Sequence, residues 1–447
     1  MKHNINKLLV VSWVVGIILM QAAHAQNQIE ISLEEARNYA NEYNHRLRAA
    51  AIDIEAARYR VKESTATGLP QIDATINYLD NIALPVQLLP GDFFDMPGQE
   101  VAIQFGTKYN ATAGGTINQL LFSGSYIVGL QAAKTFLEKT RKDYIKSQIE
   151  VNQNVSEAYF LVLATQESIE VIDSTLAITN KLANETRIIV QEGFLEETEL
   201  DQLELLIKDL EINRENALTQ LDIAIGYLKY QMGVTDGTQL ILTESLFELV
   251  NQSAIERLLS EKFSVSKNID FQVLKTQQDL AQLQLKLEKS HYLPSLSAFL
   301  NYQTQAQRQE WDFFNNKGKW YSNSAFGVTM NIPLFSSGER YSKVKQAQLQ
   351  LEQTHIAEEE ARTSLQLQYE TVMNEVINAW NTYNNTNQNK QLAAKIFHRT
   401  GIKYSEGMAS SLDLLNTHNQ YLTAQSRYIN AALNLLNQSV TLENLLQ

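Results

Sequence analysis

The sequence predicts a mixed α/β membrane protein in which an internal tandem repeat combines short amphipathic strands with very long helices. Three observations predict this class: an N-terminal export signal, a duplicated set of motifs, and segments of period-two hydrophobicity between proline-free helical stretches. The chain has 447 residues, which is more than one compact core normally holds unless the fold is elongated or repetitive.

The N-terminus has the pattern of a secretory signal peptide. Lys2 and Lys7 precede an apolar run over 8–20, and Ala23-His24-Ala25 is a cleavage site of the A-x-A type. The run is shorter than the roughly 20 residues that a transmembrane helix needs. We therefore expect residues 1–25 to be removed on export. The chain has no cysteine, which excludes a cysteine-linked lipid anchor and a thiolate metal site.

Charge and motif content argue against several classes of function. The formal net charge of −13 is unfavourable for a nucleic-acid-binding protein, which needs a basic face. The histidines after the signal stand apart, without a ligand spacing such as H-E-x-x-H, and Gly318-Lys319 lacks the upstream glycine of a phosphate loop. We therefore expect no catalytic residues, no metal site, no cofactor and no nucleic-acid partner.

Several motifs occur twice and in the same order. Leu121-Phe122-Ser123-Gly124 returns as Leu334-Phe335-Ser336-Ser337-Gly338, with one additional serine. "GLPQIDATINY" at 68–78 returns as "YLPSLSAFLNY" at 292–302, and "QEGF" at 191–194 returns as "SEGM" at 405–408. Tandem duplication is the natural explanation. We place the first repeat at 26–232, a linker at 233–265 and the second repeat at 266–447.

Apolar and polar residues alternate in four segments, which predicts four strands per chain. These strands are expected at 71–79, 110–121, 295–303 and 325–334. Their length suits a tilted crossing of a bilayer, and one apolar face with one polar face suits a barrel with lipid outside and water inside. Segments 83–106 and 304–323 are expected to form the outer loops. An antiparallel sheet on a soluble core is the alternative, but the export signal and strand length favour the membrane.

Each Leu-Phe-Ser-Gly motif is predicted to end a strand and begin a helix. Ser123 and Ser336 or Ser337 can cap the helix, and the glycine lets the backbone turn. Helices are expected at 124–192, 194–232, 338–406 and 409–446. The second helix of each repeat keeps apolar heptads, over 200–228 and 412–440, which predicts coiled-coil packing.

Four strands are too few to close a barrel, since about eight is the smallest useful number. The chain must therefore oligomerise. Three copies give a 12-stranded barrel, whereas a dimer gives eight strands whose interior is filled by side chains.

The sequence resembles the TolC-like outer-membrane efflux proteins, also called outer membrane factors. The resemblance covers about Ile31 to Leu446 and rests on the duplicated Leu-Pro strand starts, the Leu-Phe-x-Gly junctions and the Glu-Gly helix turns. It implies a homotrimer in the lipid of the Gram-negative outer membrane, whose barrel continues into a periplasmic helical tunnel. It also implies a passive exit duct, not an enzyme, for cargo that an inner-membrane pump delivers through a periplasmic adaptor.

The resemblance also implies which residues form the site. Gly193, Phe194, Gly407 and Met408 correspond to the tips that meet the adaptor, and Leu121, Phe122, Gly124, Leu334, Phe335 and Gly338 to the strand-to-helix junctions. Acidic residues past the second turn close the family's entrance, where this chain has Asp413 and then Asn416. The first repeat offers Glu199, or Asp201 if the alignment shifts by two residues.

Alternatives remain for the tips, the gate and the function. A glycine turn with a packed apolar residue would explain each tip, and an ordinary solvated carboxylate would explain Asp413. A periplasmic coiled-coil adaptor or scaffold, or the outer-membrane component of a type I secretion system, are the alternative functions. The sequence does not identify the cargo or the class of pump.

Overall fold

The computed structural model describes residues 28–234, 237–315 and 318–447. The expected signal peptide at 1–25 lies outside these residues. The chain divides into two compact units. Unit 1 holds the residues up to Asp53 with Arg141–Val273 and Glu358–Gln447, and unit 2 holds Ile54–Thr140 and Leu274–Ala357. Each unit therefore contains segments of both sequence repeats, so the repeats are not separate compact bodies.

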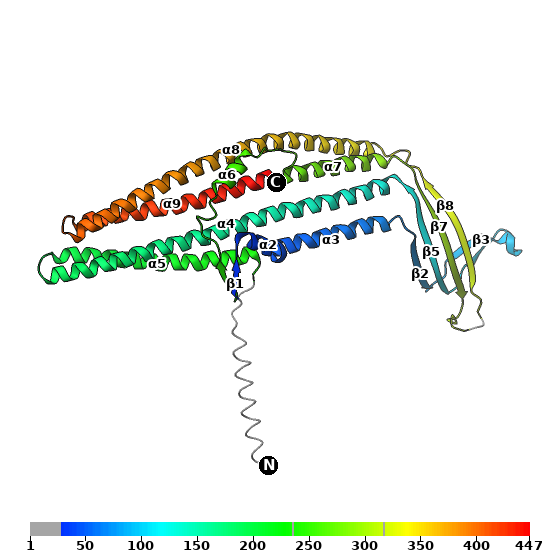
Figure 1. Ribbon diagram of the computed structural model, residues 1–447. Coiled ribbons are helices and arrows are strands. Elements are labelled where there is room, and N and C mark those ends of the chain that lie inside the picture. The colour runs from blue at the N-terminus through cyan, green and yellow to red at the C-terminus, as the bar shows by residue number, and fades with distance from the viewer. Residues whose placement is uncertain (1–27, 235–236, 316–317) are drawn as a thin grey trace, which may run out of the picture. The chain divides into compact units, whose positions relative to one another are not determined.

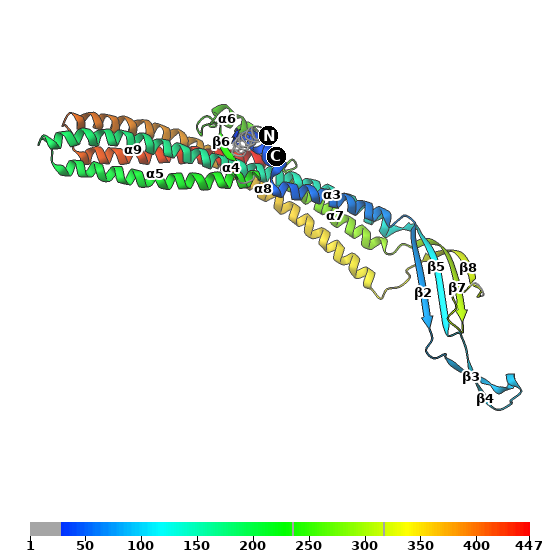
Figure 2. The ribbon, with the colours of Figure 1, turned by 90° about the horizontal axis from the view of Figure 1, so that it is seen from below.

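Unit 2 contains a four-stranded sheet with the order β2-β5-β7-β8, and all its neighbours are antiparallel (Figure 1). The strands are β2 (Gln71–Asp80), β5 (Tyr109–Ser123), β7 (Ser295–Arg308) and β8 (Tyr321–Asn331). The first outer loop carries the hairpin of β3 (Val86–Pro90) and β4 (Glu100–Gln104), with a 3-10 turn at Gly91–Phe94 between them (Figure 2). This hairpin was not predicted.

The bounds of β7 and β8 differ most from the sequence expectation. β7 runs to Arg308 and β8 begins at Tyr321, so the second outer loop is shorter than the expected 304–323. β8 ends at Asn331, before the junction motif, because Pro333 has no N–H to donate to a strand partner.

The register places most of the apolar residues of the four strands on one face of the sheet. Residues directly opposite each other on neighbouring strands point to the same face. One row across the sheet is Ile72, Ile117, Leu300 and Phe326, and the next row is Asp73, Thr116, Asn301 and Ala325. In the polar row, the Asn301 side-chain amide donates to the Thr116 hydroxyl at 3.2 Å. The sheet thus has one apolar face and one mostly polar face.

The helices of the two repeats have matching lengths. In the first repeat α3 (His45–Ala66) leads to β2, and β5 leads to α4 (Gly124–Gln191) and α5 (Glu197–Met232). In the second repeat α7 (Ile269–Ser290) leads to β7, and β8 is followed by α8 (Glu339–Ser405) and α9 (Ser411–Leu446). None of the described helices is both long enough and apolar enough to cross a membrane.

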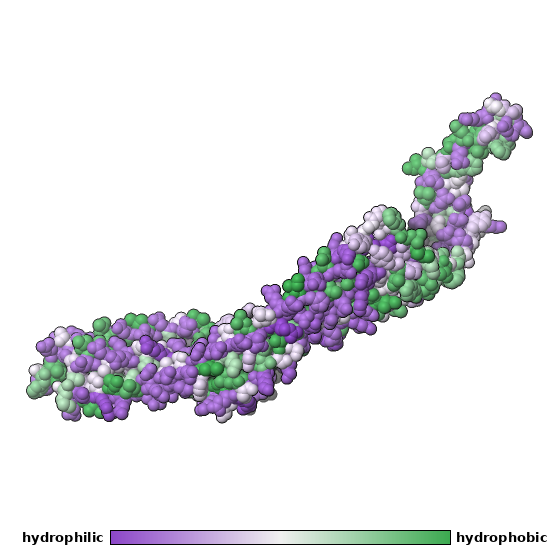
Figure 3. All heavy atoms as spheres, turned by 90° about the horizontal axis from the view of Figure 1, so that it is seen from above, coloured by the Kyte–Doolittle hydropathy of each residue, from purple (hydrophilic) through white to green (hydrophobic). Residues whose placement is uncertain are grey.

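In unit 1, α4 lies beside α5 and α8 lies beside α9 (Figure 1), as the ion pair of Arg214 with Asp173 and the stacking of Phe397 on Tyr421 show. Hydrophilic side chains dominate the visible face of these four helices (Figure 3). Their apolar residues form the core of the unit, with Val155, Tyr159 and Leu228 among its fully buried members. The heptad expected to begin at Leu412 is wrong at its start, because Leu412 is exposed and Leu414 is buried instead.

The segment between the repeats belongs to unit 1. It contains β6 (Gln239–Leu242), which pairs in parallel with β1 (Gln28–Ile31), and α6 (Gln252–Ser260). Phe247 stacks on Tyr428 of α9, and Phe263 stacks on Tyr369 of α8, with ring centroids 4.6 and 4.7 Å apart. α2 (Leu33–Tyr43) packs next to β1 and belongs to the same core.

One residue of α9 is buried without hydrogen bonds. His418 is almost fully buried, and neither ring nitrogen has a hydrogen-bond partner among the described residues. Its ring lies 5.3 Å from the ring of Phe397 on α8. Burial lowers the pKa of His418 to about 4, because the charged imidazolium would lose its hydration.

We predict that His418 makes the stability of the protein sensitive to pH. Between about pH 6.5 and about pH 4 the unfolded chain binds a proton at His418 that the folded chain does not bind. The free energy of unfolding should therefore have its full value above pH 6.5. Between pH 6.5 and about pH 4 it should fall by roughly 1.4 kcal/mol for each pH unit. Urea unfolding of the detergent-solubilised protein at a series of pH values measures this slope.

His418→Leu should remove this part of the pH dependence. His398→Leu is the matched control, because His398 is exposed on the neighbouring helix. Equal pH slopes for the wild type and His418→Leu would contradict the assignment.

Candidate functional site

The two turns that join the long helices of unit 1 are built in the same way. Gly193 follows α4 with φ of 76°, and Gly407 follows α8 with φ of 70°. After the first helix, the Phe194 N–H donates to the Ile189 carbonyl at 3.1 Å. After the second, the Met408 N–H donates to the Lys403 carbonyl at 2.7 Å. This is the Schellman motif, in which a left-handed glycine ends a helix and satisfies its last carbonyls.

The apolar residue after each glycine is exposed. Phe194 is 81% exposed and Met408 is 70% exposed. Neither side chain is therefore packed within the single chain, and the alternative explanation of each tip by a packed apolar residue is wrong there. An exposed large apolar side chain at the tip of a turn is available for contact with another molecule.

Asp413 takes part in a hydrogen-bonded cap at the start of α9. The Asp413 N–H donates to the Ser410 hydroxyl oxygen at 3.1 Å, and the Asp413 carboxylate accepts the Ser410 N–H at 3.1 Å and the Ser410 hydroxyl at 2.8 Å. This reciprocal pattern is a capping box. The hydrogen bonds from the Ser410 backbone and side chain lower the pKa of Asp413, because they stabilise the ionised carboxylate. Asp413 is exposed, but these hydrogen bonds make it a helix-capping residue and not only a solvated carboxylate.

Glu199 links the two turns. Its carboxylate accepts a hydrogen bond from the backbone N–H of Ser411 at 2.8 Å, and the Ser411 hydroxyl donates to the side-chain oxygen of Gln202 at 2.6 Å. An acidic side chain of α5 thus satisfies one of the unpaired N–H groups at the start of α9. Sequence reasoning missed Gln202 and Ser411. The Ser-x-x-Asp pattern of 410–413 could have identified the cap, but no local pattern identifies the contact between the turns.

The first repeat has two candidate equivalents of Asp413. Glu199 is the third residue of α5 and Asp413 is the third residue of α9, so these two occupy the same place in their helices. Asp201 lies two residues further on and is exposed. Asn416 is also exposed and borders a groove of about 570 Å³ between α8 and α9, together with Asn389, Asn419 and Arg427. The structure therefore brings Glu199 to the second turn and leaves Asp201 and Asn416 on the surface.

Behind the turns, polar contacts and a small apolar cluster join the helices. The hydroxyls of Thr186 on α4 and Tyr404 on α8 lie 2.9 Å apart, and Arg187 of α4 forms an ion pair with Glu204 of α5 at 2.9 Å. The cluster contains Leu203, Phe397, Tyr404 and Leu414 among its buried residues. Burial raises the pKa of Tyr404, so its hydroxyl stays protonated. The turns are thus supported on a packed base.

The junction residues lie in unit 2 and differ between the repeats. Ser123 accepts the Tyr126 N–H at 3.2 Å and so caps α4, which begins at Gly124. At the second junction, Ser337 and Gly338 both have positive φ, and Arg340 donates to the Pro333 carbonyl at 2.8 Å. Leu121 and Phe122 are partly covered, whereas Leu334 is 89% exposed and Phe335 is 85% exposed.

Among the residues that the structure describes, no group of three or more His, Asp or Glu side chains is arranged to hold a metal ion. Asp413 and Glu199 instead accept hydrogen bonds from Ser410 and Ser411 at the start of α9. The chemistry of this end of unit 1 is that of a contact surface with two conformationally constrained turns.

Comparison with known proteins agrees with this geometry. The model of the outer membrane efflux protein family matches residues 36–233 and 264–446. The outer membrane protein TolC of Vibrio cholerae is 26% identical over 371 residues, which cover 82% of this chain and 76% of that protein.

Two solved structures have a similar fold. CusC has a TM-score of 0.74 at 14% identity, over 94% of this chain and 92% of that chain. The Campylobacter jejuni CmeC outer membrane channel has a TM-score of 0.71 at 16% identity, over 93% of this chain and 85% of that chain. At these identities they support the fold alone, which has a helical majority and some sheet. The two matched segments, one for each sequence repeat, show that this chain belongs to the outer membrane efflux protein family and is an efflux channel of the Gram-negative outer membrane.

Proposed function

We propose that three copies of the chain form a 12-stranded barrel in the outer membrane, continued by a periplasmic tunnel of helices packed as coiled coils. The observation that carries this proposal is the sheet of unit 2, which has most of its apolar residues on one face and whose outer edges have no strand partner among the described residues. Unpaired strand edges are excluded from lipid, so the sheet must close with further copies.

The proposed activity is passive conduction of cargo. The channel is the exit duct of a tripartite efflux or export system, which receives cargo from an inner-membrane pump through a periplasmic adaptor. Members of this family are transport channels and not enzymes, so the protein contributes a path and a gate. The alternative of a periplasmic adaptor or scaffold is set aside, because the matched family is an outer-membrane one.

The tips of unit 1 are the proposed contact with the adaptor. Gly193 and Gly407 form turns that only a left-handed conformation permits, and Phe194 and Met408 present apolar side chains to solvent. An adaptor that buries these two side chains gains about 1.5–3 kcal/mol from each.

The gate is proposed at the start of α9. Three Asp413 carboxylates would approach one another at the tunnel entrance, where their repulsion is reduced by the hydrogen bonds from Ser410. Opening requires α9 to separate from α5, which breaks the contacts of Ser411 with Glu199 and Gln202. Glu199 thus acts on the gate by holding α9, and Asp201 and Asn416 are left as the less supported candidates.

The test of the proposed function combines location, assembly and conductance. Membrane fractionation should find the protein in the outer membrane, and native mass spectrometry should find three chains per particle. In planar bilayers the purified protein should form pores that are mostly closed and prefer cations, because the chain carries a formal net charge of −13. A soluble or inner-membrane monomer would overturn the proposal, and a clear anion preference would contradict an acidic lumen.

The tip assignment predicts that Gly407→Val reduces export without removing the channel. Valine resists the φ of 70° at this position, at a cost of roughly 1–2 kcal/mol, although a Cβ would meet no atom within 4 Å. Export of a known cargo should fall several-fold, while the trimer and its membrane location stay normal.

Gly226→Val is the matched control. Gly226 also has open space for a Cβ but lies inside α5 without a positive φ. If Gly407→Val abolishes the trimer itself, Gly407 is needed for folding and the adaptor assignment loses its support.

The gate assignment predicts that Asp413→Asn weakens block by multivalent cations. Asparagine keeps an oxygen that can accept the Ser410 hydrogen bonds but removes the charge. The concentration of a trivalent cation that halves the current from the periplasmic side should rise about tenfold or more, which corresponds to roughly 1.4 kcal/mol. Planar-bilayer recording measures it, with Asp201→Asn as the control. Equal block in the wild type and Asp413→Asn would remove Asp413 from the gate.

A further inference from the structure

The sheet of unit 2 allows a test of how the sequence repeats correspond. Ile72 and Leu296 each lie two residues after the proline of a Leu-Pro motif, and Ile117 and Met330 each lie four residues before a Leu-Phe motif, so these residues correspond. Ile72 lies opposite Ile117 where β2 pairs with β5. Their counterparts Leu296 and Met330 lie opposite each other where β7 pairs with β8. The repeat therefore predicts one strand register from the other without a shift.

The pairing of β5 with β7 has no counterpart inside one chain. There, Ile117 lies opposite Leu300. The residues that correspond to them are Met330 on β8 and Ile76 on β2, which are the two edge strands of the sheet. We propose that β8 of one copy pairs antiparallel with β2 of the next copy, with Met330 opposite Ile76. This inference rests on the trimer proposed above and specifies its interface.

The proposed register is consistent with the faces of the sheet. It places Val328 opposite Tyr78 on the apolar face, and Thr329 opposite Asn77 on the polar face. A slip of one residue would put apolar side chains of one copy beside polar side chains of the next, which register is selected to avoid.

The strand-to-helix junctions lead to the same interface. A Cβ at Gly124 would lie 2.8 Å from Leu293 and 3.2 Å from Ser290, so the first junction packs tightly on the end of α7. A Cβ at Gly338 would meet nothing within 4 Å. By the same correspondence, Gly338 of one copy would pack on Ala66 and Leu69 of the next.

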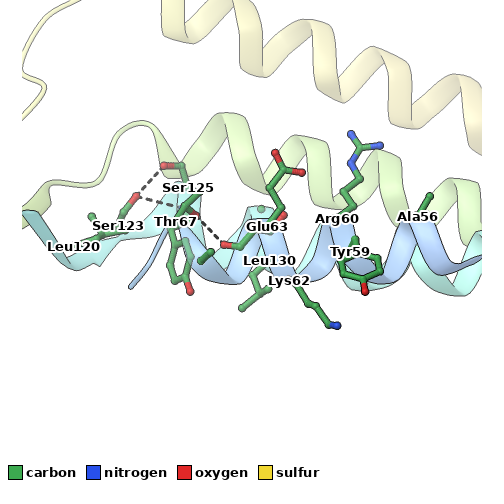
Figure 4. Close-up of a pocket in the computed structure, with 14 residues that line it drawn as sticks. Ala56, Tyr59, Arg60, Lys62, Glu63, Thr67, Leu120, Ser123, Ser125 and Leu130 are labelled. Carbon is green, nitrogen blue, oxygen red and sulfur yellow. Dashed lines mark hydrogen bonds between the residues drawn. The ribbon is translucent and has the colours of Figure 1, made fainter. Parts of the chain in front are cut away.

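The exposed side chains at both edges fit this arrangement. The side chains of Leu334 and Phe335 at the second junction are almost fully exposed to solvent, and Leu69 after α3 is more than half exposed. α3 also borders a cavity of about 1250 Å³ that Ala66, Thr67 and Lys62 help to line. In Figure 4 the side chains of Tyr59 and Lys62 point away from α8 of their own chain. The Leu-Phe-Ser-Gly motif thus packs within the chain once and between chains once.

Cysteine cross-linking tests the register directly, because the chain has no cysteine of its own. The variant Thr329→Cys with Asn77→Cys places both thiols on the polar face, opposite each other across the proposed interface. Within one chain these positions lie on opposite edges, separated by three strand spacings of about 4.8 Å. A disulfide needs Cα atoms within about 7 Å, so any bond must join two chains.

The matched control is Thr329→Cys with Ile76→Cys, which corresponds to a slip of one residue and points the thiols to opposite faces. After mild oxidation, denaturing electrophoresis without reductant should show a closed ring of three covalently joined chains. The first variant should yield about tenfold more of this species than the control.

Native mass spectrometry of the reduced variants reports the trimer independently of the cross-link. A trimer without the cross-link, or one that links better in the control, would overturn the register and leave the proposed function intact. Absence of a trimer from the reduced and the wild-type protein would instead overturn the proposed function.

Discussion

A strand edge carries unpaired backbone N–H and C=O groups, and lipid offers them no partner. The sheet of this protein ends in two such edges, β2 and β8, although the side chains of its apolar face suit a hydrocarbon environment. Closure with further copies removes both edges at once. The oligomer that we propose is therefore a condition for the sheet to be stable in the membrane.

The long helices of unit 1 face water instead of lipid, and this limits how they can be stabilised. Four helices with polar outer faces bury only narrow apolar seams, so their ends must be fixed by specific hydrogen bonds. Left-handed glycines end α4 and α8, and a capping box begins α9. The same acidic residue types that would form a gate are already engaged at these helix ends. In the gate that we propose, the same carboxylates would both cap α9 and close the entrance, which would couple the local stability of α9 to the state of the entrance.

Much of the fold could be predicted from the sequence, because it follows from local periodicity and repeated motifs. Alternation in 71–79 and 295–303 corresponds to β2 and β7, and the Glu-Gly motifs correspond to the turns at Gly193 and Gly407. The family resemblance is confirmed by the matched family, and so is the outer-membrane location. The trimer, the barrel and the roles of the site residues stay predictions.

The features that the sequence did not predict depend on contacts between distant segments. The parallel pairing of β1 with β6 joins residues more than two hundred positions apart and has no local signature. The same is true of the contact between Glu199 and Ser411, which forms only because α5 and α9 lie together. The exposure of Leu412 was missed because a heptad pattern continues past the point where the helix cap changes the packing.

Duplication supplies two similar halves, but the halves now serve different roles at both ends of the fold. At the turns, Asp413 caps its own helix, whereas Glu199, at the same place in α5, caps the helix of the other half. At the junctions, Gly124 is covered by its own chain, and Gly338 is left open. In each case the two copies of one motif make different contacts: Gly124 packs on the second half of its own chain, whereas a Cβ at Gly338 would meet no atom within 4 Å. A repeat that closed all its contacts internally would have no reason to assemble. In the trimer that we propose, this unequal use of equal motifs leaves the second junction free to contact the next copy.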